Sequence, residues 1–322
     1  MRPRLTLRTC GPEICDRKTP NEDSFYLSSQ IPGLTREDRR RAGAIRPGHR
    51  PDRDGGETTL ALLQVAEAEV RFGGLHALRG VDLAVDAGSV TGLIGPNGAG
   101  KTTLFNAICG LQGLARGRIA FDGTDMTGLK PHRRARLGIA RTFQRLEIFG
   151  SLSVRENVLA AAEIRRRWSR DRSDAAANAA GVLDLVGLAH LADRPADTLP
   201  TGHARLLELA RALATRPRLL LLDEPSSGLS DRESDELGDL LCQLAEAGMG
   251  VLLVEHDMEL VMRVCSSINV LDFGSLLMVG GPAEVRADER VRAAYLGSAE
   301  DPAGADRGGA GAFATVAGSA DA

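Results

Sequence analysis

The sequence is poor in cysteine, in aromatic residues and in long apolar runs, and each shortage excludes a class of protein. Five scattered cysteines among 322 residues do not fit a disulfide framework, so we expect reduced thiols in the cytosol. Cys10 and Cys15 lack a second pair or nearby histidines, which argues against a zinc site. No apolar run approaches the roughly 18 residues of a membrane span, and the N-terminus lacks the apolar segment of a secretory signal.

The charge balance bears on the binding partners of the protein, and the low aromatic content bears on the composition of its core. A formal net charge of -3 gives no general attraction to nucleic acid or anionic membranes. A hydrophobic content of 43% is enough for a sizeable core, and only 3% aromatic residues make that core mostly aliphatic. The chain length allows one large domain or two ordinary ones.

The two ends of the chain have a composition typical of disorder. Residues 1–58 lack periodicity and are rich in arginine, proline and glycine, so we expect a disordered extension, and we expect the same of the tail 298–322. A basic arm around residues 39–41 is an alternative, which the interleaved acidic residues disfavour. A start further downstream is another, and it would need a non-methionine codon because no methionine lies between Met1 and Met126.

Glycines gather in a segment that reads GPNGAGKT, which matches the phosphate-binding P-loop pattern. Glycine tolerates positive φ, so the backbone can curl and point its N–H groups at an anion. In this pattern Lys101 serves the β- and γ-phosphates and Thr102 ligates Mg²⁺. The predicted contacts of a bound phosphate chain are Gly95, Pro96, Asn97, Gly98, Ala99, Gly100, Lys101, Thr102 and Thr103.

Around this loop the pattern predicts a mixed α/β fold. A buried strand over 89–94 enters the loop and a helix over 103–109 leaves it. An antiparallel sheet is expected from strands over 60–65, 69–72, 81–85 and 118–121. The segment 131–214 is expected to be helical, with a capping box at Ser153 and Glu156 and a helix over 175–186. The remaining expected elements are strands over 219–222 and 250–254, a helix over 231–247, a hairpin over 268–272 and 275–279, and a terminal helix over 282–296.

Four polar residues are placed where the chemistry of a triphosphate needs them. Asp223 closes an apolar strand and can reach the Mg²⁺ shell, and Glu224 beside it can polarise water as a general base. His256 closes the neighbouring strand, where it can contact a γ-phosphate. Gln144 lies where the sheet gives way to the helical segment.

With these motifs in order, the chain from about Leu60 to Gly297 resembles the ATP-binding cassette (ABC) ATPases. The resemblance implies that Gln144 is the Q-loop residue that senses Mg²⁺ and the transport partner. It also implies that Asp223 is the Walker B aspartate, Glu224 the catalytic glutamate and His256 the switch histidine. Phe72 lies 29 residues before Lys101 (101 − 72), where the family stacks an aromatic ring on adenine.

The resemblance implies an α/β P-loop NTPase core with an antiparallel β subdomain and an inserted helical subdomain. We therefore expect an ABC ATPase domain over 59–297, with the helical subdomain over about 145–214. Its cofactors would be ATP and Mg²⁺. Its partners would be transmembrane permease subunits and a second ABC ATPase subunit in a homo- or heterodimer, with no nucleic acid.

Within the family, the chain is similar to the ATPases of branched-chain amino-acid importers. The similarity lies in residues 71–75, in ARTFQRLEIFGSLSVRENVLAA from Ala140, in residues 272–274 and in residues 291–297. It implies an ATP-hydrolysing subunit attached through permeases to the cytoplasmic face of the plasma membrane. The alternatives are an ATPase for another cargo such as urea or a lipid, and a nucleotide-binding regulatory subunit that hydrolyses little. A soluble ABC protein for DNA or ribosomes is disfavoured because neither a long insertion nor a second cassette is visible.

The family signature Leu-Ser-Gly-Gly-Gln is altered here. The aligned residues, which the family uses to contact the ATP of the facing subunit, are Leu199, Pro200, Thr201, Gly202 and His203. Pro200 has neither a hydroxyl nor an N–H, and Thr201 adds a Cβ where the backbone approaches the phosphate. Ser230 replaces the aspartate that is usual in the D-loop. We therefore hypothesise an asymmetric heterodimer, and the alternative is a tolerated variant in which the dipole of the following helix still binds the phosphate.

Overall fold

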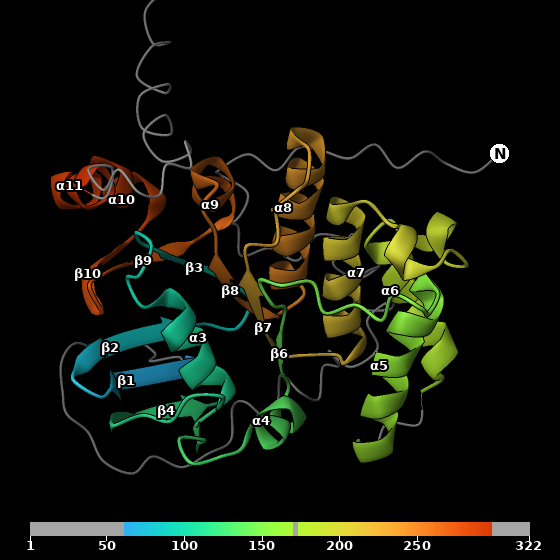
Figure 1. The fold of residues 1–322 in the computed structure, drawn as a ribbon, viewed down its shortest axis with the longest axis horizontal. Helices are drawn as coiled ribbons and strands as arrows, with labels where there is room; N and C mark the ends of the chain where they lie inside the picture. The colour runs from blue at the N-terminus through green and yellow to red at the C-terminus, as the bar shows by residue number, and fades with distance from the viewer. Residues whose placement is uncertain (1–60, 170–172, 298–322) are drawn as a thin grey trace, which may run out of the picture.

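The computed structural model describes residues 61–169 and 173–297, which form two sheets flanked by helices (Figure 1). The disorder predicted for residues 1–58 and 298–322 falls on segments outside the described residues. Within the described ranges, none of the helices combines the length and the apolar character that crossing a bilayer requires.

The first sheet is antiparallel, as predicted, and contains four strands. They are β1 (Leu63–Phe72), β2 (Leu75–Val85), β4 (Arg116–Phe121) and β5 (Thr124–Asp125), in the order β2-β1-β4-β5. The prediction of two strands over 60–65 and 69–72 was wrong, because β1 runs through both. A bulge at Glu67, whose φ is 47°, interrupts the alternation of apolar residues and so imitates a strand end. β2 also begins six residues before the predicted start at Val81 (81 − 75).

The second sheet has six strands in the order β10-β9-β3-β8-β7-β6. Its parallel strands are β6 (Ile139–Arg141), β7 (Leu219–Asp223), β8 (Gly250–Val254), β3 (Val90–Ile94) and β9 (Ser267–Asp272). β10 (Ser275–Gly280) pairs antiparallel with β9, which confirms the predicted hairpin. β6 corrects the prediction that 131–214 is helical throughout. Its three residues are too few to show a period of two.

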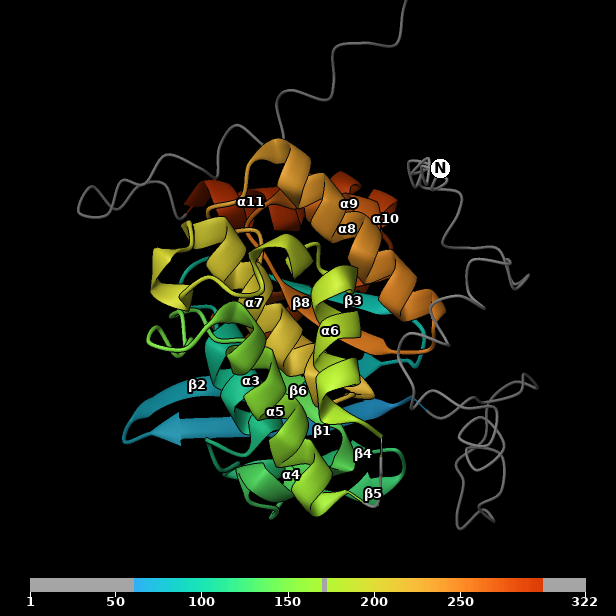
Figure 2. The ribbon, with the colours of Figure 1, turned by 90° about the vertical axis from the view of Figure 1, so that its right-hand side faces the viewer.

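The helices cover the sheets and extend to one side. They are α3 (Lys101–Cys109), α4 (Pro131–Leu137), α5 (Val154–Trp168), α6 (Ala175–Leu185), α7 (Thr201–Ala214), α8 (Asp231–Glu246), α9 (Met258–Val264), α10 (Pro282–Ala287) and α11 (Glu289–Gly297), with short 3-10 turns at Ala189–Leu191 and Ala196–Thr198. α5, α6 and α7 pack on one another at the side that faces the viewer in Figure 2. The Ser153–Glu156 capping box is present, with the Glu156 N–H donating to Ser153 Oγ at 3.2 Å.

Two helix predictions needed correction. The expected terminal helix over 282–296 is broken at Asp288, whose backbone is extended and whose carboxylate accepts the N–H of Arg290 at 2.8 Å. The Arg290 guanidinium, together with the backbone N–H groups of Arg290 and Val291, lowers the pKa of Asp288 to about 2. α9 was not predicted at all, because it is only seven residues long and follows directly on the strand end at His256.

The core lies on both faces of the parallel sheet, and β7 shows why. Its leucines alternate, so that Leu220 and Leu222 enter one apolar cluster with α5–α9 while Leu219 and Leu221 enter the other with α3 and the antiparallel sheet. The uninterrupted apolar run that predicted a doubly buried strand is thereby explained. Because β3, β7 and β8 run parallel, their carboxyl ends meet at one edge, where polar residues follow each strand.

Candidate nucleotide site

The P-loop lies between β3 and α3, and two of its glycines, Gly95 and Gly100, have no room for a side chain. Gly95 has φ of 149° and Gly100 has φ of 107°. A Cβ on Gly95 would lie 2.1 Å from the carbonyl oxygen of Leu271, and one on Gly100 would lie 2.8 Å from that of Ala77. The neighbouring strands therefore press on the loop, and only glycine lets it keep the curl that the motif predicts.

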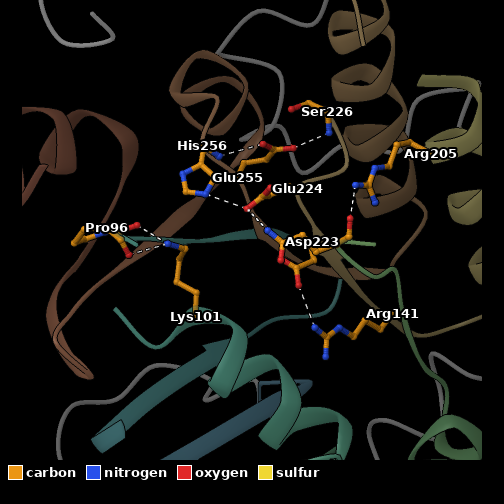
Figure 3. A network of polar contacts seen from close by, with 11 residues as sticks. Pro96, Lys101, Arg141, Arg205, Asp223, Glu224, Ser226, Glu255 and His256 are labelled. Atoms are coloured by element: carbon orange, nitrogen blue, oxygen red, sulfur yellow. Dashed lines mark hydrogen bonds and ion pairs between the residues drawn. The ribbon is translucent and has the colours of Figure 1, made fainter. Parts of the chain in front are cut away.

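Lys101 lies inside this curl and bonds to its own loop. Its Nζ donates to the carbonyl oxygens of Gly95 at 2.5 Å and Pro96 at 3.0 Å, and the residue is 8% exposed (Figure 3). Burial lowers the pKa of Lys101, while the nearby carboxylates of Glu224 and Asp223 raise it. Two backbone carbonyls thus hold the ammonium group inside the loop. The oxygens of an anion can replace them as hydrogen-bond acceptors.

Glu224 contacts two other predicted site residues. Its Oε1 lies 3.0 Å from His256 Nε2 (Figure 3). The same oxygen accepts a hydrogen bond from Gln144 Nε2 at 3.4 Å. These residues follow β7, β8 and β6, so the convergence expected from the strand ends is present. Glu224 also has φ of 52°, a left-handed conformation that is costly for a residue with a Cβ and that recurs at functional sites.

Asp223 has a partner that sequence reasoning missed. Arg141 Nη2 lies 3.0 Å from Asp223 Oδ2, and the two side chains are only 7% and 4% exposed. Arg141 Nη1 also donates to Asn106 Oδ1 at 2.6 Å, and its guanidinium lies 5.4 Å from the ring of Phe105 and 5.1 Å from that of Phe143. Its place three residues before Gln144 was the available signal, but nothing in that spacing indicates which carboxylate it meets.

The predicted residues Gln144, Asp223 and Glu224 line a cleft of about 380 Å³. Phe72, half exposed at the end of β1, lines it together with Lys101 and His256. The P-loop residues from Asn97 to Thr103 line it as well. A hydroxyl from Thr102, an amide oxygen from Gln144 and the Asp223 carboxylate are the hard oxygen donors that Mg²⁺ prefers, so the donor set at this cleft fits that ion.

Comparisons with known proteins identify the family. Residues 78–227 match the family model described as ABC transporter, and residues 275–301 match that described as branched-chain amino acid ATP-binding cassette transporter. The chain is 41% identical over 251 residues to the high-affinity branched-chain amino acid transport ATP-binding protein BraF of Pseudomonas aeruginosa. The aligned region covers 74% of this chain and 98% of BraF. The chain belongs to the ABC transporter ATP-binding family.

Other members are similarly close. The chain is 38% identical to LivG of Escherichia coli, a protein of the same description, over 74% of this chain and 98% of LivG. A nucleotide-free ATP-binding cassette superposes with a TM-score of 0.67 at 29% identity, covering 73% of this chain and 99% of that one. An ATP-binding cassette in its ADP conformation gives 0.67 at 30% identity, covering 74% and 99%. The fold expected from the resemblance is therefore confirmed.

The altered signature of this ABC ATP-binding chain lies outside the cleft, at the start of α7. That helix begins at Thr201, and Pro200 stands at its N-cap without a side-chain cap. A Cβ on Gly202 would lie 3.0 Å from the carbonyl oxygen of Gly228, so this glycine allows α7 to touch the loop before α8. Leu199 packs against the core beside α7.

The two departures from the family pattern lie close to each other. His203 Nε2 is 3.8 Å from Glu233 Oε1, and Glu233 Oε2 accepts the N–H and the hydroxyl of Ser230 at 2.8 Å. Ser230 and Glu233 together form the capping box of α8. A shared carboxylate thus connects the histidine of the signature with the serine of the D-loop.

Side chains of α7 also bind backbone groups of the loop around Gln144, the predicted Q-loop. Arg205 Nη1 donates to the carbonyl oxygen of Phe143 at 2.7 Å, and its Nη2 donates to that of Gln144. The N–H of Glu147 donates to Glu208 Oε1 at 2.7 Å. Burial raises the pKa of Glu208, while its hydrogen bonds and Arg205 lower it. The signature helix and the loop that carries Gln144 are therefore joined directly, a connection that no sequence motif indicated.

Proposed function

We propose that the chain is the ATP-hydrolysing subunit of an importer for branched-chain amino acids. It docks as a peripheral subunit on transmembrane permeases at the cytoplasmic face of the plasma membrane and pairs with a second ABC ATPase subunit. The names of BraF and LivG and the match of residues 275–301 support the cargo. The fold supports nucleotide binding, because a related cassette is described in an ADP conformation.

In this proposal the residues of the cleft divide the chemistry among them. The P-loop amides and Lys101 bind the β- and γ-phosphates, and Phe72 stacks on the adenine. Thr102, Asp223 and Gln144 hold Mg²⁺, which supplies positive charge for the phosphates when bound. Glu224 orients the attacking water and accepts its proton, and His256 donates toward the γ-phosphate.

The observation that carries this proposal is the contact of Glu224 with both His256 and Gln144. A carboxylate held by these two groups at the edge of a P-loop cleft is placed to polarise water. We expect Glu224→Gln to bind ATP with Mg²⁺ and to turn it over at least about 100-fold more slowly, since general-base catalysis contributes roughly 10²–10⁴-fold. Glu259→Gln, on the exposed start of α9, is the matched control and should retain activity. Normal turnover by Glu224→Gln would refute the proposed role.

The cargo is tested with the permease partners. We expect ATPase activity of the complex in vesicles to rise when a leucine-loaded binding protein is added, and radiolabelled leucine to enter. Entry of urea or a lipid without entry of leucine would replace the proposed cargo while leaving the ATPase role intact.

The altered signature favours a second candidate, a regulatory subunit with little hydrolysis of its own. Pro200 gives the start of α7 neither a cap nor an N–H. The asymmetric heterodimer is a separate hypothesis: there this chain's P-loop would form the competent site with its partner's signature, and only the site at its own signature would be weak. Restoring the family residues with Pro200→Ser, Thr201→Gly and His203→Gln should raise ATPase activity several-fold. No rise would remove the asymmetry hypothesis and favour a tolerated variant.

A further inference from the structure

Glu255 is a buried carboxylate between two loops that carry the proposed catalytic residues. It follows β8, directly before His256, and is 3% exposed. Its Oε1 accepts the N–H of Ser226 at 2.7 Å and its Oε2 accepts the N–H of His256 at 3.1 Å (Figure 3). Burial raises the pKa of Glu255, while these backbone donors lower it. One side chain therefore joins the loop after β7 to the loop after β8.

The first of these loops needs such support, because Glu224 holds a left-handed backbone. A non-glycine residue keeps that conformation only where the surroundings fix it. Three hydrogen bonds do so here. The Glu224 N–H donates to the Val254 carbonyl at 2.9 Å, the Ser227 N–H donates to the Glu224 carbonyl at 3.3 Å, and Ser226 donates to Glu255. Two of the three acceptors belong to β8 and the residue after it.

We propose that Glu255 is a positioning residue that keeps Glu224 and His256 in register, with 3.0 Å between Oε1 and Nε2. The inference rests on the proposed function, which assigns the catalytic roles to those two residues. Glu255 does not line the cleft, and each of its oxygens already accepts a backbone N–H, so it neither touches the substrate nor serves as a base. Its contribution is geometric.

The two hydrogen bonds that the Glu255 oxygens accept explain why a carboxylate is needed at this position. A carboxylate offers two oxygen acceptors, whereas a glutamine amide offers one oxygen and an NH₂ group. The glutamine of Glu255→Gln has nearly the same shape as glutamate, but its NH₂ would face the N–H of either Ser226 or His256. Both groups are donors, so no hydrogen bond would form there. One of the two loops would then lose its anchor, and the Glu224–His256 contact would open.

The experiment compares three variants by steady-state ATPase kinetics and by binding of a fluorescent ATP analogue. Glu255→Gln should lower kcat by roughly 10-fold or more, because one buried donor is left unpaired. The KM and the nucleotide Kd should stay within about twofold, since Glu255 is not among the residues that line the cleft. Glu255→Asp, which keeps both oxygens, should retain more activity. Glu284→Gln, the same replacement at a carboxylate that accepts the Gly281 N–H on α10, should change nothing.

Two further results decide between positioning and mere packing. Adding Glu255→Gln to Glu224→Gln should slow turnover by a clearly smaller factor than Glu255→Gln does in the otherwise unchanged chain, because part of its effect acts through Glu224 and only the rest through His256. A lower melting temperature with unchanged kcat would overturn the proposal.

A measurement that does not depend on catalysis tests the role of Glu255 even if the proposed function is wrong. Amide hydrogen exchange over residues 224–228 and 255–257 should accelerate in Glu255→Gln and not in Glu284→Gln. If the wild-type chain hydrolysed no ATP, the proposed function would fall while this comparison still showed whether Glu255 joins the loops. Unchanged exchange would overturn the inference, whatever the activity. If Glu255→Gln does not fold, Glu255→Asp is measured instead: its shorter side chain should give a smaller loss of kcat and a smaller rise in exchange, and no change in either would overturn the inference.

Discussion

Replacing Arg141 by methionine should destabilise the domain far more than the loss of an ordinary surface arginine. Arg141 and Asp223 are 7% and 4% exposed, so removing the cation leaves a buried carboxylate without its partner. Breaking a buried ion pair in this way costs about 3–5 kcal/mol. For a domain of this size each kcal/mol lowers Tm by roughly 2–4 °C, which gives a fall of roughly 6–20 °C. Methionine keeps the contacts with the rings of Phe105 and Phe143 and thus isolates the charge.

The assays are urea unfolding for the free energy and thermal unfolding for Tm, both followed by far-UV circular dichroism, with Arg218→Met as the matched control. Arg218 pairs with Asp122 at 2.7 Å and also lies over a phenylalanine ring, but its side chain is 42% exposed and that of Asp122 is 46% exposed. Such exposed pairs contribute about 0–1 kcal/mol. If Arg141→Met lost no more stability than Arg218→Met, the buried-pair argument would be refuted. Adding Asp223→Leu to Arg141→Met should recover much of the loss, because no unpaired charge then remains.

Three further substitutions test two residues of the site and one contact that holds the loop before α5. Phe72→Ala should weaken ATP binding roughly 5- to 150-fold, the equivalent of losing about 1–3 kcal/mol of base stacking, and an unchanged Kd would count against Phe72 as the adenine contact. Gly95→Ala should lower Tm and abolish nucleotide binding, because its Cβ would strike a β9 carbonyl, whereas Gly123→Ala, also at positive φ but in open space, should fold and bind. Asn157→Ala should cost about 1–3 kcal/mol in urea unfolding and speed proteolysis near Phe149, whose N–H and carbonyl it binds at 2.9 and 3.0 Å. Equal proteolysis of both proteins would contradict that account.

Local signals in the sequence were enough to predict the frame of the site. The glycine spacing predicted the curl at Lys101, and the apolar runs of β7 and β8 predicted doubly buried strands. Because parallel strands end at one edge, the sequence also predicted that Asp223 and His256 would be neighbours. The roles assigned to these residues stay predictions, as do the boundaries of the helical subdomain.

The features that sequence reasoning missed are all non-local or irregular. Arg141 meets a carboxylate 82 positions away, and Arg205 meets carbonyls more than 60 positions away, so no local period records either contact. The bulge at Glu67 divided one strand into two apparent ones, and the break at Asp288 left the apolar spacing of a helix intact. Sequence patterns report which face of an element is apolar, but they do not report which polar groups meet across the fold.

The way α7 holds the Q-loop has a consequence for how this surface can evolve. Arg205 and Glu208 hold the loop by two carbonyls and one amide, groups that every residue type except proline supplies. Arg145 and Leu146, both exposed between those anchors, contribute no side chain to the grip. Substitutions at these two positions therefore leave the attachment of the loop to α7 intact, so the exposed side chains can change during evolution while the position of the loop is kept.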